Sequence, residues 1–589
     1  MRAQSKNSIR LFKKHITRLI TIIAIVIVSV GFMSGIGEVE GKVGIAIDSE
    51  YKAQNIADLY LKSQNEYGFL PNELEIVKNR FKDEQIMGFF SYELKIDDLI
   101  TRIYYLDLDK NNISSLKLLE GEMPSKANQI LAERGTDGYK YYSVGEKVSI
   151  EGIEYEISGI AYNPMLSIKL NEPSFRYEDK KLGQVFYLNT DTPPIINDIY
   201  VSLTDRELFD SYSDEYKEKI DLLKAEITQL LGDSVSVLSL YENMGLYSLN
   251  EYANKVGLIG IIFVVFFLLV TLLIVYSAMT RLFDEERGKI ACLKTLGYSN
   301  FAIIKSYLLF VLTGTVIGGI IAYFVGLGLT NIIYIAFGIQ YQMPSFPAET
   351  TFYYYAITFL IVVVATLLLT FFTGLSVSKK RPVDLLVKKS AKAGGKVLLE
   401  RIPFIWNRFS FKYKSTFRNV FLFKSRFLMT ITSVIGGAVL IFAGIGLLNC
   451  AQGRENSSSL IFVSIALIIF SAALCALTIY NLTNINVSER TREIATLMVL
   501  GYDEKEVQGY IFREVYIMSF IGAILGIPFG MIFVHFVFSQ INFGGLDQIG
   551  WWCYVLAPAI TMVFSFISTL LLRKRITKTD MNASLKTLE

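Results

Sequence analysis

Two stretches of the sequence, 204 residues apart, repeat the same order of charged and apolar residues. The first runs from Glu285 to Tyr298 and the second from Glu489 to Tyr502, with Glu, Ile, Ala, Leu, Leu, Gly and Tyr matching position by position. In each copy, apolar residues recur at helical spacing after a charged beginning, and a Gly-Tyr pair follows. The pattern predicts a short amphipathic helix whose chemistry is binding. Such a helix fits an apolar groove on a partner protein or lies on a lipid surface.

Residues suited to catalysis or metal binding are few. The chain has two histidines, and its four cysteines are scattered without a CxxC pair, so zinc ligands and histidine acid–base chemistry are poorly supplied. Neither an HExxH nor a G-x-S-x-G motif occurs. Each Gly-Lys pair is followed by Val or Ile, so no G-x-x-x-x-G-K-[ST] phosphate loop is present. The sequence therefore predicts a chain that is not an enzyme and that holds no cofactor or metal of its own.

Apolar residues are concentrated in blocks, and these predict membrane spans. A bilayer core of about 30 Å requires about 20 apolar residues in a helix. Eight segments meet this requirement: 19–36, 258–276, 307–326, 353–372, 427–448, 460–480, 515–534 and 552–572.

The charges are divided between the two sides of the predicted membrane. Residues 37–254 carry a net charge of −17, and the rest of the chain carries +20. Lys and Arg gather before the first span, between the second and third, between the fourth and fifth, and after the eighth. By the positive-inside rule, these regions and both termini are cytoplasmic in a multi-pass cell membrane protein, and residues 37–254 are extracytoplasmic. Positive charge beside apolar spans also argues against a nucleic-acid partner.

The internal repeat extends into the spans that follow the two short helices. Gly318, Ala322 and Gly326 correspond to Gly522, Gly526 and Gly530, and small residues four apart allow close helix packing. The sequence therefore predicts two parallel four-span repeats with one external domain in the first. The predicted parts are an N-terminus and first span (1–36), an external domain (37–254), spans two to four (255–378), a basic connector (379–426), spans five to eight (427–572) and a tail (573–589).

The external segment has the patterns of an α+β domain. Alternation over 147–160 predicts strands, 198–203 predicts another strand, and 206–231 predicts a helix. No sustained heptads occur in 37–254, so no long coiled coil is expected there. The fold class is thus an eight-span α-helical membrane protein with one α+β extracytoplasmic domain.

The repeated stretches resemble the coupling helix of the FtsX-like permease family, the membrane subunits of MacB-type ABC transporters. That family has a charged cluster followed by I-[GA]-x-L-[KR]-x-L-G-[YF], which 285–298 and 489–502 match except at Met498, where the pattern has a basic residue. The connector at 395–406 and the stretch at 480–486 are similar to the large two-repeat members, and 119–124 resembles a strand entry of the external domain.

The resemblance implies that both repeated helices contact an ATPase. The implied charged contacts are Glu285, Arg287, Glu489, Arg490, Arg492 and Glu493; the apolar anchors are Ile290, Leu293, Ile494 and Leu497; and Gly297 and Gly501 are helix stops. Because the chain lacks a phosphate loop, ATP would be bound by a separate subunit. Two copies of that cytoplasmic ABC ATPase are expected for one chain.

The implied function is mechanotransmission. The spans would carry ATPase movement to the external domain, which would export or extract a lipid, peptide or drug. The alternative is a regulatory module that controls an extracytoplasmic partner such as a cell-wall hydrolase. Membrane lipid and an extracytoplasmic protein or lipid ligand are the further expected partners.

Overall fold

The chain forms two compact units in the computed structural model. The structure describes residues 10–577 apart from 137, 167–171, 210, 212, 345, 348–351, 387–399, 401, 402, 407, 423, 455 and 456. The helical unit comprises Met1–Glu38, Lys255–Ile333 and Thr351–Glu589. The sheet domain comprises Val39–Asn254 and Tyr334–Thr350.

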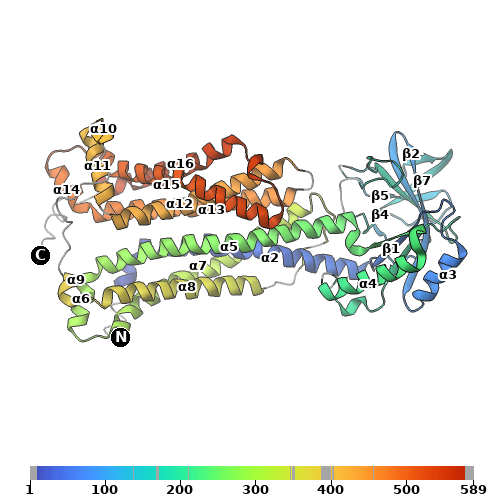
Figure 1. Ribbon diagram of the computed structural model, residues 1–589, viewed down its shortest axis with the longest axis horizontal. Coiled ribbons are helices and arrows are strands. Elements are labelled where there is room, and N and C mark those ends of the chain that lie inside the picture. Colours follow the sequence, from blue (N-terminus) through green and yellow to red (C-terminus); the bar gives the residue numbers. More distant parts are fainter. Residues whose placement is uncertain are drawn as a thin grey trace. The chain divides into compact units, whose positions relative to one another are not determined.

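The described part of the chain contains eight helices that are long and apolar enough to cross a membrane (Figure 1). The first repeat supplies four of them and the second repeat the other four. They are α2 (Ile16–Ala53), α5 (Met244–Glu285), α7 (Asn300–Phe337), α8 (Phe352–Ser378), α12 (Lys424–Gln452), α13 (Ser458–Glu489), α15 (Glu504–Ile541) and α16 (Trp551–Thr577). Together with the separate α+β domain, they confirm the predicted fold class.

Two of these helices are longer than their apolar segments. Helix α2 continues through Glu38 and Lys42 to Ala53, and α5 begins at Met244. The predicted limits at residues 37 and 254 therefore lie inside helices. A hydropathy pattern marks the part of a helix that suits lipid, whereas backbone hydrogen bonding continues through polar residues.

Small residues bring the first and third long helices of each repeat together. A Cβ atom built on Gly318 of α7 would lie 2.9 Å from Val26 Cβ of α2, and one on Gly522 of α15 would lie 2.8 Å from Val434 Cβ of α12. Gly526 has the same role, with Ala438 Cβ 2.6 Å away. The stripes predicted from the sequence are therefore the close-packing faces of both repeats.

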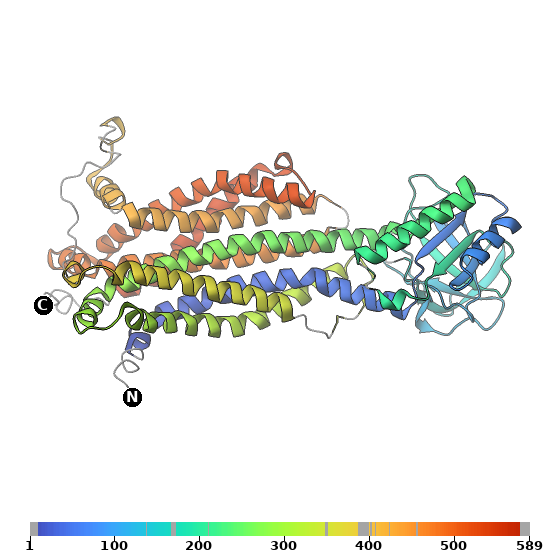
Figure 2. The same cartoon turned by 60° about the horizontal axis from the view of Figure 1, so that its bottom comes forward.

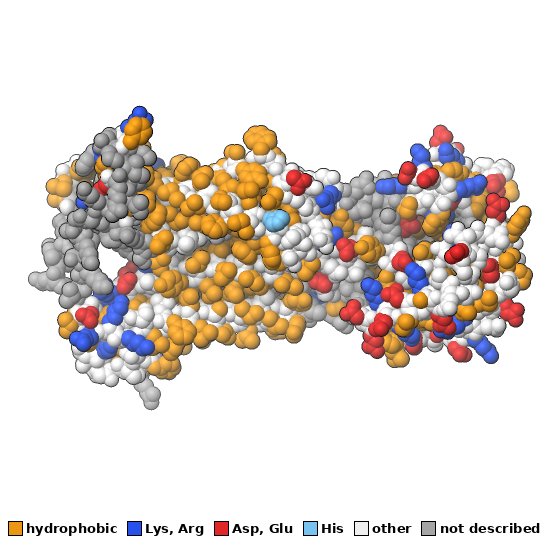
Figure 3. Space-filling model, viewed as in Figure 1, with side chains coloured by type: hydrophobic (Ala, Val, Ile, Leu, Met, Phe, Trp, Pro, Cys, Tyr) orange, Lys and Arg blue, Asp and Glu red, His pale blue; other side chains and the backbone are white. Residues whose placement is uncertain are grey.

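The two repeats also pack on each other through aromatic rings. Phe32 of α2 lies 5.4 Å from Phe470 of α13, and Phe263 of α5 lies 5.1 Å from Phe533 of α15, measured between ring centroids. On the face shown in Figure 3, hydrophobic side chains cover the middle of the helical unit, whereas charged side chains gather on the sheet domain. The apolar outer surface is what helices in lipid require.

The connections of the helical unit contain several short helices. They are α6 (Arg287–Thr295), α9 (Pro382–Leu386), α10 (Pro403–Trp406), α11 (Phe411–Leu422) and α14 (Thr491–Val499), with the 3₁₀ turn η5 at Leu546–Gln548. Figure 2 shows α6 and α14, which correspond to the repeated stretches, at the same end of the long helices.

A ten-stranded sheet forms the sheet domain. Its order is β10-β1-β9-β2-β3-β8-β5-β7-β4, with β6 paired to β7. The strands are β1 (Leu59–Ser63), β2 (Gln85–Ile96), β3 (Leu99–Leu106), β4 (Lys117–Gly121), β5 (Gln129–Glu133), β6 (Lys147–Ile150), β7 (Ile153–Tyr162), β8 (Gln184–Asn189), β9 (Asp198–Ser202) and β10 (Val235–Ser239). The β6–β7 hairpin and β9 confirm the strands predicted at 147–160 and from 198.

Two helices cover one face of the β10-β1-β9 part of the sheet. Helices α3 (Pro71–Arg80) and α4 (Asp214–Leu231) form a core there with Leu59, Leu61 and Val201. The predicted helix 206–231 is wrong at its start, because Ser213 caps α4 by accepting a hydrogen bond from the backbone N–H of Tyr216. Residues Arg206–Leu208 form a separate 3₁₀ turn.

The segment 334–350 also groups with the sheet domain, although the sequence assigned it to the membrane part. Arg134, which follows β5, donates a hydrogen bond from Nη1 to Gln342 Oε1 at 2.9 Å. Spatial grouping of this loop depends on such long-range contacts, which leave no local pattern in the sequence.

Candidate functional site

The two repeat helices, α6 and α14, have the same backbone geometry. Each follows a long helix after a single residue, Glu286 before α6 and Arg490 before α14. Gly297 and Gly501 then adopt positive φ angles of 86° and 88°. Both ends form a Schellman motif, in which Gly297 N–H bonds to the Lys294 carbonyl and Tyr298 N–H to the Leu293 carbonyl, with the equivalent bonds at Gly501 and Tyr502. The shared residues therefore fix where each helix stops.

A carboxylate holds the beginning of the first repeat helix. Glu286 is buried, and its Oε1 lies 2.7 Å from Lys14 Nζ and 3.0 Å from His15 Nε2. Arg18 pairs with the neighbouring Glu285. Hydrogen bonds from His15 and Lys14 hold the pKa of Glu286 well below its usual range. The residues just before and at the start of α2 are thus tied to the junction of α5 and α6.

An arginine holds the beginning of the second repeat helix. Arg490 Nη1 lies 2.7 Å from Glu514 Oε1 of α15, and the two side chains are only 6% and 7% exposed. Burial lowers the pKa of Arg490, but the nearby carboxylate of Glu514 more than compensates, so the pKa is raised overall. Arg490 occupies the position that Glu286 has in the first repeat, so the charge is reversed and the partner lies on another helix.

The predicted apolar anchors do not all face outward. Ile290 and Ile494 are 1% and 0% exposed and pack inside the chain, which corrects their prediction as surface contacts. Leu293 and Leu497 are half-buried. The exposed apolar residues lie at the ends of the helices, where Leu296 is 73% and Leu500 68% exposed. Leu296 and Leu500 belong to the same apolar pattern at helical spacing as these residues. The pattern alone could not tell which side of each helix faces the rest of the protein.

The predicted charged contacts divide into two groups. Arg490 is occupied by its buried partner, and Glu285 by Arg18. Arg287 is partly exposed, with Nη2 3.4 Å from the Asp384 carbonyl, and Glu493 is exposed. The side chains of Glu489 and Arg492 lie outside the described residues.

Lys294 explains the basic position of the repeated pattern. Its Nζ donates hydrogen bonds to the carbonyls of Ser378 and Lys380, at 2.5 Å and 2.7 Å, where α8 ends. A cation at a helix C-terminus satisfies free carbonyls and is favoured by the helix dipole. Met498, at the equivalent position, packs instead against the apolar cluster around Val507 and Ile511. The departure of the second copy from the pattern is therefore a change from capping to packing.

A second site lies on the sheet domain and was not predicted. It is a cavity of about 140 Å³ on the face opposite α3 and α4. The lining residues are Tyr60, Arg102, Tyr104, Met165, Leu166, Glu172, Pro173, Phe175, Tyr200, Leu238, Ser239, Glu242 and Asn243. Alternation along β1 and β9 produces this face, because Leu59, Leu61 and Val201 point to the helices and Tyr60 and Tyr200 to the other side.

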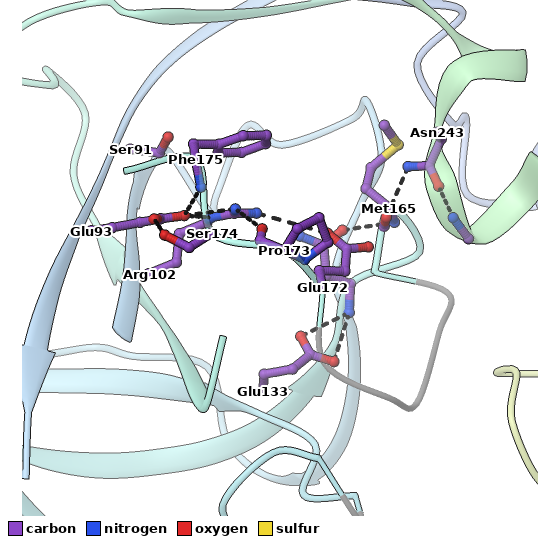
Figure 4. Close-up of polar contacts among 12 residues, drawn as sticks. Ser91, Glu93, Arg102, Glu133, Met165, Glu172, Pro173, Ser174, Phe175 and Asn243 are labelled. Atoms are coloured by element: carbon purple, nitrogen blue, oxygen red, sulfur yellow. Dashed lines mark hydrogen bonds and ion pairs between the residues drawn. The ribbon is translucent and has the colours of Figure 1, made fainter. Parts of the chain in front are cut away.

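Arg102, which lines the cavity, belongs to a buried ion pair with Glu93 (Figure 4). Arg102 donates from Nε and Nη2 to Glu93 Oε1, at 2.9 Å and 2.7 Å. Glu93 also accepts hydrogen bonds from Ser174 Oγ and from the backbone N–H groups of Phe175 and Arg176. It therefore holds the loop that contains these three residues over strand β2. Burial raises the pKa of Glu93, but Arg102 and these donors outweigh it and hold the pKa below its usual range.

Two further carboxyl groups near the cavity are less well compensated. Burial raises the pKa of Glu172 to about 7, with partial relief from Arg102. Burial also raises the pKa of Glu133 to about 8, although Tyr187 Oη and the backbone N–H of Asn163 donate to it. A turn at Asp97 and Asp98, with φ angles of 49° and 63°, sets the β2–β3 register that places Glu93 opposite Arg102. That two-residue turn is the signal from which the pair could have been found.

Comparison with known proteins assigns the helical part. The model of the FtsX-like permease C-terminal domain matches residues 261–382 and 465–581. No curated protein matches the chain. The two matched regions include α6 and α14 together with three long helices each. The family consists of membrane permease components of ABC-type systems, which work with ATPase partners. The chain is therefore a multi-pass membrane protein that carries two copies of the FtsX-like permease C-terminal domain.

Proposed function

We propose that the chain is the permease subunit of an ABC transporter of the MacB/FtsX type. It binds two copies of a separate ATPase subunit, one at α6 and one at α14. The observation that carries this proposal is the duplicated helix end, with the same Schellman motif and an exposed leucine in both copies. Two equivalent binding elements on one chain fit two equivalent partner subunits.

The contact surface includes the end of each repeat helix. Leu296 and Tyr298 in the first repeat, and Val499, Leu500 and Tyr502 in the second, are exposed apolar or aromatic side chains. Arg287 and Glu493 lie in the same helices as candidate polar contacts. A groove on the ATPase that accepts such a helix would bury these side chains and gain roughly 25 cal/mol for each Å² of apolar area.

The ion pairs behind the helices suit the transmission of movement. ATP-driven approach of the two ATPases shifts α6 and α14, and each shift passes to the helices to which the buried charges connect them. They are α2, which begins directly after the Glu286 partners Lys14 and His15, and α15, which supplies the Arg490 partner Glu514. The mechanism requires two discrete arrangements whose balance nucleotide changes. Its output is the export or extraction of a lipid, peptide or drug by the sheet domain.

The proposed orientation places α6 and α14 in the cytoplasm and the sheet domain outside. The basic connections of the helical unit support it by the positive-inside rule. Cys292 of α6 provides a natural probe, because it is exposed whereas Cys450, Cys475 and Cys553 are buried. A membrane-impermeant maleimide should label Cys292 in inside-out vesicles and leave it unlabelled in right-side-out vesicles.

Copurification with the ATPase tests the proposal. The chain is expressed with the candidate ATPase, purified in detergent, and assayed for stoichiometry, ATP hydrolysis and labelling of Cys292. A complex of one chain with two ATPases should protect Cys292 from the maleimide. Leu296→Asp and Leu500→Asp should each weaken the complex, whereas Leu222→Asp, at an exposed leucine of α4, should leave it intact.

The outcomes separate the alternatives. Absence of an ATPase complex, with Cys292 labelled equally in all samples, would show that the repeat helices are lipid-surface elements. A 1:2 complex that hydrolyses ATP but moves no lipid, peptide or drug would favour regulation of an extracytoplasmic protein.

A further inference from the structure

The cavity of the sheet domain has the dimensions of a site for a small group. Its volume of about 140 Å³ is close to that of cavities that hold one benzene molecule. Tyr60 and Tyr200 lie opposite each other on paired strands, with ring centroids 5.3 Å apart. Tyr104 lines the same cavity from β3, and Phe175 covers the Arg102 guanidinium at 4.0 Å. Aromatic side chains therefore form much of the lining.

The charges in the lining are unevenly compensated. Arg102 is neutralised by Glu93, and its Nη2 also donates to the Pro173 carbonyl at 3.2 Å. Glu242 pairs with Lys224. The Glu172 carboxylate, whose side chain is 13% exposed, lies 3.8 Å from Arg102 Nη1, which is beyond hydrogen-bond distance. Within the described part of the chain, no donor bonds to its oxygens.

A carboxylate in this position costs free energy unless a cation or a donor meets it. Burying a carboxylate without hydrogen bonds is unfavourable. The Arg102 guanidinium does not supply these hydrogen bonds to Glu172, because it is bonded to Glu93. The aromatic rings present electron-rich faces, which attract an organic cation and do not attract an anion. The surplus charge and the aromatic lining thus select the same kind of ligand.

We propose that this cavity binds an organic ammonium group, with Glu172 as the counter-ion and Tyr60, Tyr104 and Tyr200 as the aromatic cage. The ligand is the charged end of an amine-bearing molecule, either a free amine or a lipid headgroup. Binding at this site does not depend on the ATPase partner and goes beyond the proposed transport role. The full chain can therefore be tested alone.

Titration of the purified chain with matched ligands tests the site. The full chain in a maltoside detergent is titrated with choline and with 3,3-dimethylbutan-1-ol, a neutral molecule of the same shape, by calorimetry and saturation-transfer NMR. Choline should bind at least about tenfold more tightly than the neutral analogue, because only choline carries the charge. Equal binding of the two, or binding of neither, would overturn the proposal.

Three variants connect binding to the cavity. Glu172→Gln keeps the shape and should weaken choline binding about tenfold or more, whereas Glu178→Gln, at an exposed glutamate of the same loop, should leave it unchanged. Tyr200→Leu should also weaken binding by removing one face of the cage. Thermal unfolding of each variant confirms that the fold is retained. Unchanged binding in Glu172→Gln would place the ligand elsewhere.

A short-chain phosphocholine below its micellar concentration distinguishes the two sources of the ammonium group. Competition between this molecule and choline indicates that the site accepts a lipid headgroup. Binding of choline without such competition indicates that the adjacent phosphate is excluded, so that the ligand is a free amine. Both results retain the ammonium site and assign its source.

Discussion

The first repeat anchors its short helix through a buried carboxylate, and the second anchors the equivalent helix through a buried arginine. Glu286 meets Lys14 and His15, which lie just before α2, whereas Arg490 meets Glu514 of α15. The helix, its stop and its exposed end are the same in both repeats. The comparison teaches that the binding element is duplicated while its attachment to the body of the protein has diverged.

The long helices of the two repeats also differ, in their lengths. Helices α2 and α5 have 38 and 42 residues, whereas α12 and α13 have 29 and 32. At 1.5 Å per residue, α2 alone is about 57 Å long, well beyond the bilayer core of about 30 Å. Only the first repeat carries the sheet domain between its first two long helices. The attachment of the first repeat through Glu286 therefore involves residues directly before the helix that continues into that domain.

The largest expected effect is the loss of the buried partner in the second repeat. Glu514→Ala leaves buried Arg490 with only the exposed Glu493 carboxylate, 3.9 Å from its Nε, which should cost about 3–5 kcal/mol of stability. Thermal unfolding in detergent measures the loss. Glu504→Ala, at an exposed residue of the same helix, should cost less than about 1 kcal/mol. The double change Arg490→Leu with Glu514→Leu should be milder than Glu514→Ala; equal losses would argue against an uncompensated charge as the cause.

The sheet domain, which only the first repeat has, should respond to pH through Glu133. The pKa of Glu133 is about 8 in the folded chain and about 4.3 in the unfolded chain. The contribution of protonated Glu133 to the stability of the domain is therefore fully present below the unfolded pKa and is lost as the pH rises through 8. Between pH 6 and 8 the loss should reach about 2 kcal/mol. Hydrogen exchange in β5, corrected for its intrinsic pH dependence, measures it.

Glu133→Gln provides the control for this pH response. The amide stays neutral, so the variant should remove the dependence and be more stable than the parent protein at pH 8. Exchange in α15 of the second repeat should be insensitive to the change. A pH response of β5 that persists in Glu133→Gln would assign it to another group.

The glycine stripes should behave alike in the two repeats. Gly526→Ala places a Cβ 2.6 Å from Ala438 Cβ, and Gly318→Ala places one 2.9 Å from the Ile23 carbonyl oxygen, so each should cost about 1–3 kcal/mol through separation of the helices. Gly328→Ala has no neighbour within 4 Å and should be neutral or slightly stabilising. Thermal unfolding compares the three, and a cost confined to one repeat would show that only that repeat depends on close packing.

The helix stops should also have equal effects. Gly297→Ala and Gly501→Ala each force a Cβ into a left-handed backbone conformation, at a cost of about 1 kcal/mol. Faster amide exchange at the ends of α6 and α14 measures it. Gly288→Ala, inside α6 and in open space, should slow exchange instead, because alanine favours helix. Unequal effects of the first two changes would mean that the stops are held by different contacts.

The smallest effect is expected for Lys14. Its side chain is 65% exposed, and His15 remains beside Glu286 when it is removed, so Lys14→Met should cost less than about 1 kcal/mol. The same thermal unfolding assay applies. A loss as large as that of Glu514→Ala would show that the two attachments are equivalent in strength despite their different exposure.

Much of the helical architecture could be predicted from local patterns. Apolar runs of sufficient length indicate the long helices, and the 204-residue repeat locates α6, α14 and the glycine stripes. Gly297 and Gly501 mark the helix ends because few other residues tolerate their backbone angles. Ile290 and Ile494 show the limit of such patterns, since an amphipathic face does not reveal whether it meets the chain itself or a partner.

The sequence by itself determined the spans, the duplication and the ends of the short helices, because each depends on residues close together in the chain. Only the tertiary structure decided that Glu286 meets His15, that Arg490 meets Glu514, and that Arg102, paired with Glu93, lines one cavity together with Glu172. These contacts join residues from separate elements, and their free energy depends on burial and on distances of a few ångströms. Such quantities arise only when the helices and strands have packed.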